Sequence, residues 1–328
     1  MSILGATGLK VSPIGLGLAA LGRPDYINLG HAKDLGDHSV DAMESHAYEL
    51  LDAAWESGVR YFDVARSYGL AECFLGAWLK RRAIEPQSVT VGSKWGYYYA
   101  ANWHIDAEKH EIKDHSLPLL RRQWEESSGF LGAQLDLYQI HSATTESRVL
   151  DNQEVLLELF RLSQGGIKIG LTLSGPGQSE TLHKALSVRF EGVPLFQCVQ
   201  ATWNLLDPSA CGALAEAKAA GWGVIIKEAL ANGRLTMRNT EPSFIVKREK
   251  LERQAKRLNT TIDVLAISGA LAQPWADVVL SGAVTTDQLR SNLKALKLVW
   301  DEEAAAELSI ISEPAEQYWA ERSKLAWN

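Results

Sequence analysis

Four side chains capable of acid–base chemistry stand at or just after the ends of short apolar segments. Asp63 ends the segment VRYFD and Tyr68 follows it closely, while Lys94 ends VTVGSK and His141 ends LYQIH. A phenol ionises near pH 10, and a neighbouring ammonium lowers that pKa, so Lys94 would assist Tyr68 with Asp63 as its counter-ion. Tyr68 would then donate a proton to a developing alkoxide while His141 orients the same oxygen. The four residues predict proton transfer at a carbonyl or alcohol oxygen.

Each of the four residues also has an ordinary structural explanation when taken alone. His141 could be a hydrogen-bonded core residue, Asp63 a helix cap, Lys94 a surface side chain and Tyr68 a packing residue with its hydroxyl in water. Their joint position argues against these explanations, because consecutive strand ends of a barrel meet at one rim. We therefore expect a single site that contains all four.

The elements that must position these residues alternate along the chain. Short apolar segments, which we expect to be strands, occur at residues 14–21, 59–63, 89–94, 137–141, 167–173, 198–202, 223–227 and 277–282. Stretches with helical period lie between most of them, at residues 41–58, 71–82, 151–166, 178–188, 208–221, 261–273 and 286–298. This alternation in a chain of 328 residues is typical of an α/β fold, the (β/α)8 TIM barrel. A doubly wound open sheet is the structural alternative.

The chain shows no internal boundary. Because no composition shift or linker divides it, we expect one domain over residues 1–328. Residues 2–12 place short apolar runs around a glycine-rich turn, which predicts an N-terminal β-hairpin. Two long loops, residues 22–39 and 96–116, follow predicted strands. We expect these extended loops at the C-terminal face of the barrel, where the active sites of this fold lie.

The composition excludes several classes of partner. The chain has 46% hydrophobic and 22% charged residues and a net charge of −7, which disfavours nucleic acid and anionic membranes. The N-terminus does not read as a signal peptide, and no apolar run is long enough to span a bilayer. Cys73, Cys198 and Cys211 lack disulfide or zinc spacing. We expect a cytoplasmic protein without a metal site, whose oligomeric state stays open.

The segments around the four residues resemble those of the aldo-keto reductase superfamily. YFDVARSYGLAECFLGAWL is similar to the family's stretch with Asp and Tyr, VGSKWG to its lysine segment and DLYQIHSA to its histidine segment. The resemblance covers nearly the whole chain and implies a (β/α)8 barrel with an N-terminal hairpin. It also implies a catalytic tetrad and hydride transfer between a nicotinamide cofactor and a carbonyl or alcohol carbon of an aldehyde, ketone or sugar. The tetrad is Asp63, Tyr68, Lys94 and His141.

The resemblance further implies a cofactor site along the C-terminal half of the chain. IGLTLSG, CVQATWNLL, GVIIKEALANGRLT and LSGAVTTDQLRSNL are similar to the family's cofactor segments. The residues assigned to this site are Thr172, Ser174, Gln200, Lys227, Leu230, Asn232, Gly282, Gln288 and Asn292.

Two departures from the family pattern bear on the cofactor. Lys227 aligns with an aromatic residue that stacks on the nicotinamide in many members. Gly282 and Gln288 align with the Lys and Arg that some members use for the 2′-phosphate of NADP. Other members manage with a Gln at that place, and Arg290 is near enough in sequence to contribute. On this basis we favour NADP(H) over NAD(H).

Aromatic residues after the predicted lysine strand suggest a substrate pocket. We assign Trp95, Tyr97 and Trp103 to it, and Trp319 and Trp327 near the C-terminus are further candidates. Aromatic rings bind sugar rings as well as flat apolar substrates, and each of these residues could equally pack a loop. The expected partner is therefore a small carbonyl or alcohol compound of unspecified identity.

Two other functions remain open. A lysine at a barrel strand end can form a Schiff base, so an aldolase-type lyase would use Lys94. A non-catalytic NAD(P)H-binding redox sensor would bind the cofactor without turnover. The cofactor segments disfavour the lyase and the intact tetrad disfavours the sensor. The leading prediction is an NAD(P)(H)-dependent oxidoreductase with Tyr68 as general acid/base.

Overall fold

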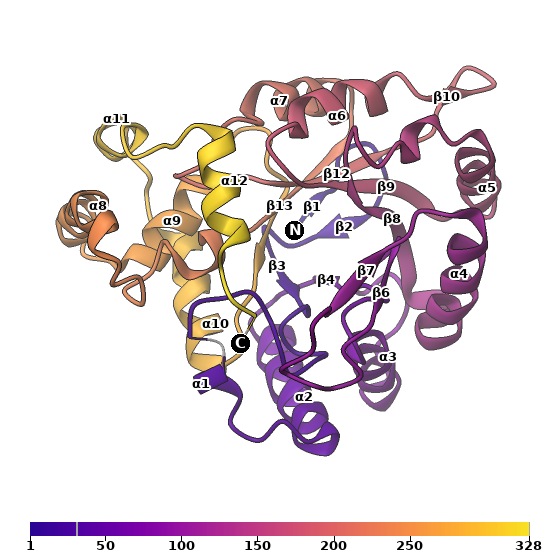
Figure 1. Ribbon diagram of the computed structural model, residues 1–328, viewed down its shortest axis with the longest axis horizontal. Helices are drawn as coiled ribbons and strands as arrows, with labels where there is room; N and C mark the ends of the chain where they lie inside the picture. Colours follow the sequence, from indigo (N-terminus) through magenta and orange to yellow (C-terminus); the bar gives the residue numbers. More distant parts are fainter. Residues whose placement is uncertain (31, 328) are drawn as a thin grey trace.

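The computed structural model describes residues 1–30 and 32–327 and contains a closed barrel of eight parallel strands (Figure 1). In order around the barrel, the strands are β3 (Ile14–Gly17), β4 (Tyr61–Asp63), β5 (Thr90–Trp95), β8 (Leu135–Ala143), β9 (Lys168–Leu173), β12 (Cys198–Thr202), β13 (Gly223–Lys227) and β14 (Val278–Ser281). The closed parallel sheet confirms the predicted (β/α)8 barrel and excludes the open sheet.

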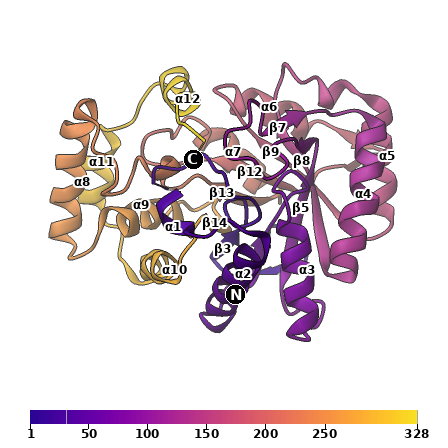
Figure 2. The ribbon, with the colours of Figure 1, turned by 60° about the horizontal axis from the view of Figure 1, so that its bottom comes forward.

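Helices surround the strands (Figures 1 and 2). They are α1 (Ala32–Leu35), α2 (Val40–Glu56), α3 (Ala71–Arg81), α4 (Leu117–Leu131), α5 (Gln153–Gln164), α6 (Gln178–Leu186), α7 (Cys211–Ala219), α8 (Ile245–Arg257), α9 (Ile262–Leu271), α10 (Thr286–Leu293), α11 (Glu302–Ser309) and α12 (Ala315–Ser323). Helix α5 shows why they pack in this way: Asn152 caps its first turn, and Val155, Leu159 and Leu162 form one buried face. Within the described ranges, no helix has the length and apolar character needed to cross a membrane.

The N-terminal hairpin closes the bottom of the barrel. Strands β1 (Ser2–Ile3) and β2 (Lys10–Val11) pair antiparallel, as predicted. Leu4 and Val11 belong to a buried cluster with Tyr61 and Ile225 from the barrel interior. The amide of Ala6 also donates a hydrogen bond to the backbone just before β13. The hairpin therefore excludes water from the end of the barrel opposite the predicted site.

Both long loops carry structure at the mouth of the barrel. The loop after β5 contains a second hairpin, β6 (Tyr97–Tyr99) and β7 (Glu111–Lys113), and leads into α4. Outside these two loops, a third short pair, β10 (Arg189–Phe190) and β11 (Val193–Pro194), lies between α6 and β12 in the chain. The loop after β3 crosses to the loop after β13, where the Asn232 amide group donates to Ile27 O at 2.8 Å and the Leu29 amide donates to Asn232 O at 3.1 Å.

A tyrosine inside the barrel supports the future site from below. Tyr61 is fully buried and its hydroxyl donates to Asp63 Oδ2 at 3.2 Å. The neighbouring position on β5 is Gly92, where a Cβ atom would lie 2.5 Å from the Tyr61 hydroxyl oxygen. Glycine is therefore required there by the close approach of the phenol.

Candidate active site

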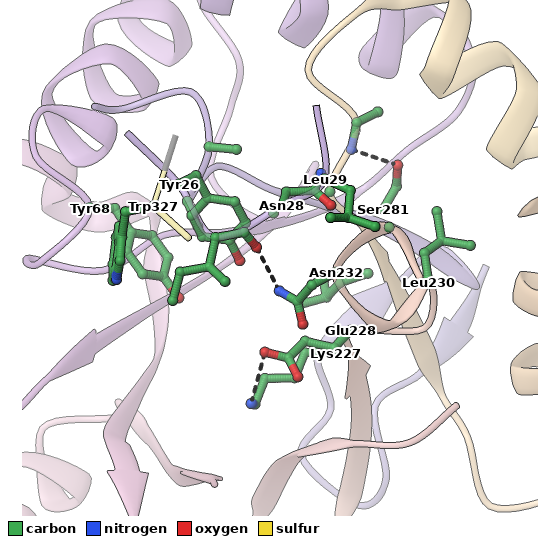
Figure 3. A pocket seen from close by; sticks show the side chains of 18 of the residues that line it. Tyr26, Asn28, Leu29, Tyr68, Lys227, Glu228, Leu230, Asn232, Ser281 and Trp327 are labelled. Carbon is green, nitrogen blue, oxygen red and sulfur yellow. Dashed lines mark hydrogen bonds and ion pairs between the residues drawn. The ribbon is translucent and has the colours of Figure 1, made fainter. Parts of the chain in front are cut away.

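A cleft of about 1290 Å³ opens at the C-terminal ends of the barrel strands. Asp63, Tyr68, His141, Gln200 and Lys227 all line it, so residues distant in sequence meet at one mouth. In Figure 3, Tyr68 and Trp327 stand at one end of this cleft and Leu230 and Ser281 toward the other, with Asn232 between them. The cleft is therefore elongated. A ligand could react at the Tyr68 end while another part of it binds at the Leu230 and Ser281 end (Figure 3).

Asp63 accepts hydrogen bonds from three buried donors on three elements. Lys94 Nζ lies 2.5 Å from Oδ1, while Gln200 Nε2 lies 2.8 Å and the Tyr61 hydroxyl 3.2 Å from Oδ2. Lys94 Nζ also donates to the carbonyl oxygen of Val64 at 2.9 Å. A carboxylate can be buried when such donors surround it, which explains why an apolar strand ends in aspartate.

Tyr68 lies directly beside this ion pair. Lys94 Nζ is 4.7 Å from the centre of the Tyr68 ring, and the His141 ring meets it edge-on at 5.5 Å between centres. The sequence suggested that Lys94 lowers the pKa of Tyr68. Burial and the charges of Asp63 and Glu111 instead raise the pKa of Tyr68 well above 10, although Arg23 acts in the opposite direction. Tyr68 is consequently a protonated phenol at neutral pH, ready to donate.

His141 is held neutral by its surroundings. Burial, followed by the charges of Lys94, Lys227 and Arg23, lowers the pKa of His141 well below 6.5. Its Nδ1 lies 3.4 Å from the hydroxyl oxygen of Ser67. A neutral imidazole with one nitrogen occupied by Ser67 keeps the other nitrogen for a ligand oxygen.

Lys227 belongs to a charged group on the opposite wall. Its Nζ donates to the hydroxyl of Thr202 at 3.0 Å and lies 4.0 Å from Glu228 Oε1. Arg322 from α12 forms an ion pair with the same carboxylate. Burial lowers the pKa of Lys227 to about 8, whereas Arg322 and Lys227 outweigh burial and lower the pKa of Glu228 to about 2. This group therefore carries a net positive charge at neutral pH.

A second charged group, which the sequence analysis did not assign, surrounds Arg23. The guanidinium is buried, lies 2.8 Å from Glu111 Oε1 and donates to Ser67 O at 3.0 Å. It also stands over the Trp327 ring at 4.8 Å. The preceding residue, Gly22, packs tightly against the backbone of Tyr68, since a Cβ atom on Gly22 would lie 2.1 Å from Tyr68 O. This close packing holds Arg23 beside Tyr68. The place of Arg23 in the loop directly after β3 is a signal that sequence reasoning could have used.

Two of the three aromatic residues assigned to the substrate pocket do not line the main cleft. Trp95 is fully buried, because β5 alternates its side chains and turns Trp95 outward with Ser93, while Lys94 points into the barrel. Trp103 lines a separate cavity of about 370 Å³, and its Nε1 donates to His38 O at 2.7 Å. Tyr97 does line the cleft, with its ring centre 4.9 Å from that of His141.

Most residues assigned to the cofactor reach the cleft. Those that line it are Ser174, Gln200, Lys227, Leu230, Asn232, Gly282, Gln288 and Asn292. Thr172 does not line the cleft. It is buried, and its hydroxyl accepts a hydrogen bond from the Ser142 amide at 2.7 Å. Asn292 Nδ2 donates to Ser281 Oγ at 2.8 Å, which ties α10 to the end of β14.

The middle of the cleft has two features that would suit a dinucleotide. Asn232 is 7% exposed, and its Oδ1 has no hydrogen-bond partner among the described residues, so a polar ligand would satisfy it. At Gly282, an added Cβ would have no neighbour within 4 Å, which leaves this backbone open to the cleft. Phosphate groups in this fold bind at the loops after the seventh and eighth strands, and these residues lie there. A nicotinamide dinucleotide therefore fits the residues present.

The described residues also bear on a metal centre. Among residues 1–30 and 32–327, no group of three or more His, Cys, Asp or Glu side chains is arranged to hold a metal ion.

Comparisons with known proteins show which family the chain resembles. The Aldo/keto reductase family matches residues 13–313. The uncharacterized oxidoreductase YrpG of Bacillus subtilis is 24% identical over 329 residues, covering 92% of each protein. L-galactose dehydrogenase of Arabidopsis thaliana is 27% identical over 328 residues, covering 95% of this chain and 93% of that protein. The holo form of aldo-keto reductase AKR11C1 from Bacillus halodurans has a TM-score of 0.71 at 22% identity, covering 97% of this chain and 98% of that one. Since the family match spans the barrel from its first strand to α11, the chain belongs to the aldo/keto reductase family.

Proposed function

We propose that this protein is an NAD(P)(H)-dependent oxidoreductase that interconverts a carbonyl compound and its alcohol, with Tyr68 as general acid/base. The observation that carries the proposal is the buried Lys94–Asp63 ion pair, 2.5 Å between Nζ and Oδ1, beneath the ring of Tyr68 and beside a neutral His141. The bound nicotinamide supplies or accepts the hydride. The chain supplies the proton and the groups that hold the substrate oxygen.

Each residue of the tetrad has a separate task in this reaction. During reduction, the phenol of Tyr68 protonates the oxygen of the alkoxide that forms when the carbonyl carbon receives the hydride. The ammonium of Lys94 stabilises the phenolate left behind, and Asp63 holds that ammonium in place through the ion pair. His141 presents a neutral ring nitrogen to the same oxygen. In oxidation, the phenolate takes the proton from the alcohol as the hydride leaves its carbon.

The geometry favours this reaction over the lyase. A Schiff base requires an accessible, unprotonated amine. The Lys94 side chain is 0% exposed and its Nζ is bound by Asp63 and Val64 O, so a substrate carbonyl has no route to it. A redox sensor would bind the cofactor in the same cleft. Only turnover of a substrate distinguishes an enzyme from such a sensor.

The substrate is a small carbonyl or alcohol compound. The relative named L-galactose dehydrogenase spans nearly the whole chain, which supports placing aldoses beside aldehydes and ketones in a substrate screen. The cysteines Cys73, Cys198 and Cys211 are free, in keeping with our proposal of a cytoplasmic location.

The replacement Tyr68→Phe tests the proposal. We expect loss of turnover by about 10³-fold or more, since it removes the proton donor, with cofactor affinity unchanged. Tyr48→Phe is a matched control, because that hydroxyl bonds Glu44 on the outer helix α2. Turnover that survives in Tyr68→Phe at the level of the control would contradict the assigned role.

A further inference from the structure

The cleft has a distinct end formed by α9 and α10. Asp263, Ile267, Asp287, Gln288 and Ser291 line it, and we call it the α9–α10 end. Asn292 of α10 bonds Ser281, which Figure 3 shows on the side of the pocket away from Tyr68. If the reacting ring of a dinucleotide lies near Tyr68, as the proposed function requires, the adenosine half must occupy the α9–α10 end. Between the two ends lies Asn232 Oδ1, which has no partner among the described residues and could accept a hydrogen bond from a ligand hydroxyl.

An arginine at this end is already neutralised. Arg238 lines the cleft and forms two hydrogen bonds with Asp34, from Nη1 to Oδ2 at 2.6 Å and from Nη2 to Oδ1 at 2.7 Å. Gln288 Nε2 donates to the same carboxylate at 2.9 Å, and its Oε1 accepts from the Val284 amide at 2.9 Å. A two-fold arginine–carboxylate contact is the strongest pairing available to a guanidinium, so Arg238 does not offer a free charge to another anion.

The remaining charges at this end are mostly negative. Asp263 accepts a hydrogen bond from Ser291 Oγ at 2.7 Å, and the Asp287 side chain is 92% exposed at the start of α10. Arg290 was a candidate for a phosphate contact, but its side chain is 69% exposed, pairs with Asp287 at 3.4 Å and is not among the described residues that line the cleft. Of the described residues that form the α9–α10 end, none offers an unpaired cation.

These charges discriminate between the two nicotinamide cofactors. A phosphate monoester carries a charge between about −1.5 and −2 at pH 7 and binds where arginine or lysine compensates it. Here it would meet Asp263 and Asp287, whereas an unmodified ribose hydroxyl is uncharged and can donate to such carboxylates. We infer that the α9–α10 end selects NAD(H) and rejects NADP(H) through Asp263, which has no cationic partner among the described residues, and Asp287, whose partner Arg290 is exposed outside the cleft. This inference rests on the proposed function and departs from the preference for NADP(H) suggested by the sequence.

The test measures binding of each cofactor to the complete protein without substrate. Quenching of the 11 tryptophans is titrated with NADH and NADPH, and calorimetry repeats the comparison with AMP and adenosine 2′,5′-bisphosphate as probes of the adenosine half alone. We expect NADH and AMP to bind about tenfold more tightly than their 2′-phosphorylated partners at low salt, as unfavourable charge contacts at close range predict.

Variants assign the discrimination to these carboxylates. The double replacement Asp263→Asn with Asp287→Asn is expected to tighten NADPH binding about fivefold and to leave NADH within about twofold. Each Asn still offers an acceptor oxygen to the ribose hydroxyl, whereas the phosphate is no longer repelled by the two negative charges. Glu154→Gln, in the first turn of α5, is the matched surface control. Equal or tighter binding of NADPH by the unmodified protein overturns the inference and leaves the proposed function standing. Binding of neither cofactor overturns both.

Discussion

Asp63 is the residue on which the candidate site depends. It joins Lys94, Gln200 and Tyr61, which come from different strands or different levels of the barrel interior. Each donor offsets part of the cost of burying a carboxylate, and the carboxylate in turn fixes the ammonium beside Tyr68. Stability and chemistry are therefore coupled at this position.

Replacing Asp63 with Asn is expected to destabilise the protein strongly. The change leaves the fully buried Lys94 ammonium without its counter-ion, which costs about 3–5 kcal/mol in the free energy of unfolding. Urea unfolding measures the difference. Asp151→Asn is the control, since its pair with Lys184 is 2.6 Å long but solvent-exposed and is worth about 0–1 kcal/mol. If the two variants lost similar amounts of unfolding free energy, burial of the Lys94–Asp63 pair would not make Asp63 more important than an exposed partner.

Lys227 makes the affinity for the oxidised cofactor depend on pH. Burial lowers the pKa of Lys227 to about 8, so the side chain is charged below that pH and neutral above it. The oxidised nicotinamide ring is a cation and the reduced ring is neutral. We expect the oxidised cofactor to bind several-fold more tightly as pH rises through about 8, with little change for the reduced form. Titrations at pH 7 and pH 9 compare the two forms, and Lys227→Gln should abolish the difference. A pH dependence that persists in this variant would assign the effect to another group, because Glu228, Arg322, Lys94 and Asp63 also face this amine.

The sequence predicted that Asp63, Lys94 and His141 lie at consecutive strand ends with Tyr68 just after the first, and the structure brings these four side chains together. The prediction that Trp95 lines the substrate pocket was wrong. Side chains alternate along β5, so Lys94 points into the barrel and its neighbour Trp95 points outward.

The sequence also did not indicate Arg23 and Glu228, whose roles arise from partners distant in the chain, Glu111 and Arg322. The position of Arg23 in the loop after β3 could have indicated a residue near the site, but its pairing with Glu111, like that of Glu228 with Arg322, has no local signature in sequence.

Strand β5 illustrates how an element prepares the site. Its alternation sends Gly92 and Lys94 inward, and the missing side chain of Gly92 admits the Tyr61 hydroxyl that supports Asp63. The strand thus supplies both the cation of the site and the space beneath its carboxylate.

Gly92→Ala should disturb this arrangement. A Cβ atom 2.5 Å from the Tyr61 oxygen forces the ring to move, and we expect a loss of about 1–3 kcal/mol in the free energy of unfolding, together with reduced activity. Gly129→Ala in α4 is the matched control, because nothing lies within 4 Å of the added Cβ and alanine favours the helix by about 0.5–1 kcal/mol. Thermal unfolding distinguishes the two. A Gly92 variant as stable as wild type would mean that Tyr61 does not require this space.

The eight strands were predicted because each is a short apolar segment bounded by turns. The sequence did not predict α1, α4, α8, α11 and α12, or the short pairs β6–β7 and β10–β11. Helix α8, IVKREKLERQAKR, buries only Leu251, Gln254 and Ala255, so its apolar period is faint. The β6–β7 hairpin lies in a loop where apolar and polar residues do not alternate clearly, so the sequence offered little indication of strands there.

The barrel and its N-terminal hairpin share one buried interface. Leu4 is 0% exposed and lies against Gly223, while Val11 packs in the same cluster. Since the barrel has no free edge, loss of this plug exposes apolar surface common to several strands.

We therefore expect unfolding of the whole chain as one cooperative unit. Tryptophan fluorescence and far-ultraviolet circular dichroism should report coincident urea transitions, in line with the single domain predicted from the sequence. Leu4→Ala should shift both transitions together by about 2–5 kcal/mol, since it opens a cavity between hairpin and barrel. Two separated transitions, or a shift in only one signal, would show that the parts unfold independently.

The central claim, that this molecule transfers hydride between a nicotinamide and a carbonyl carbon, is tested most directly with reduced cofactor that carries deuterium at both C4 positions of the nicotinamide. Purified protein is mixed with this cofactor and a panel of aldehydes, ketones and aldoses, and the alcohol products are analysed by mass spectrometry. The account predicts one deuterium on the former carbonyl carbon of the product, and about 10³-fold slower formation of that product with Tyr68→Phe. Product that lacks deuterium, or that forms without cofactor, would contradict it.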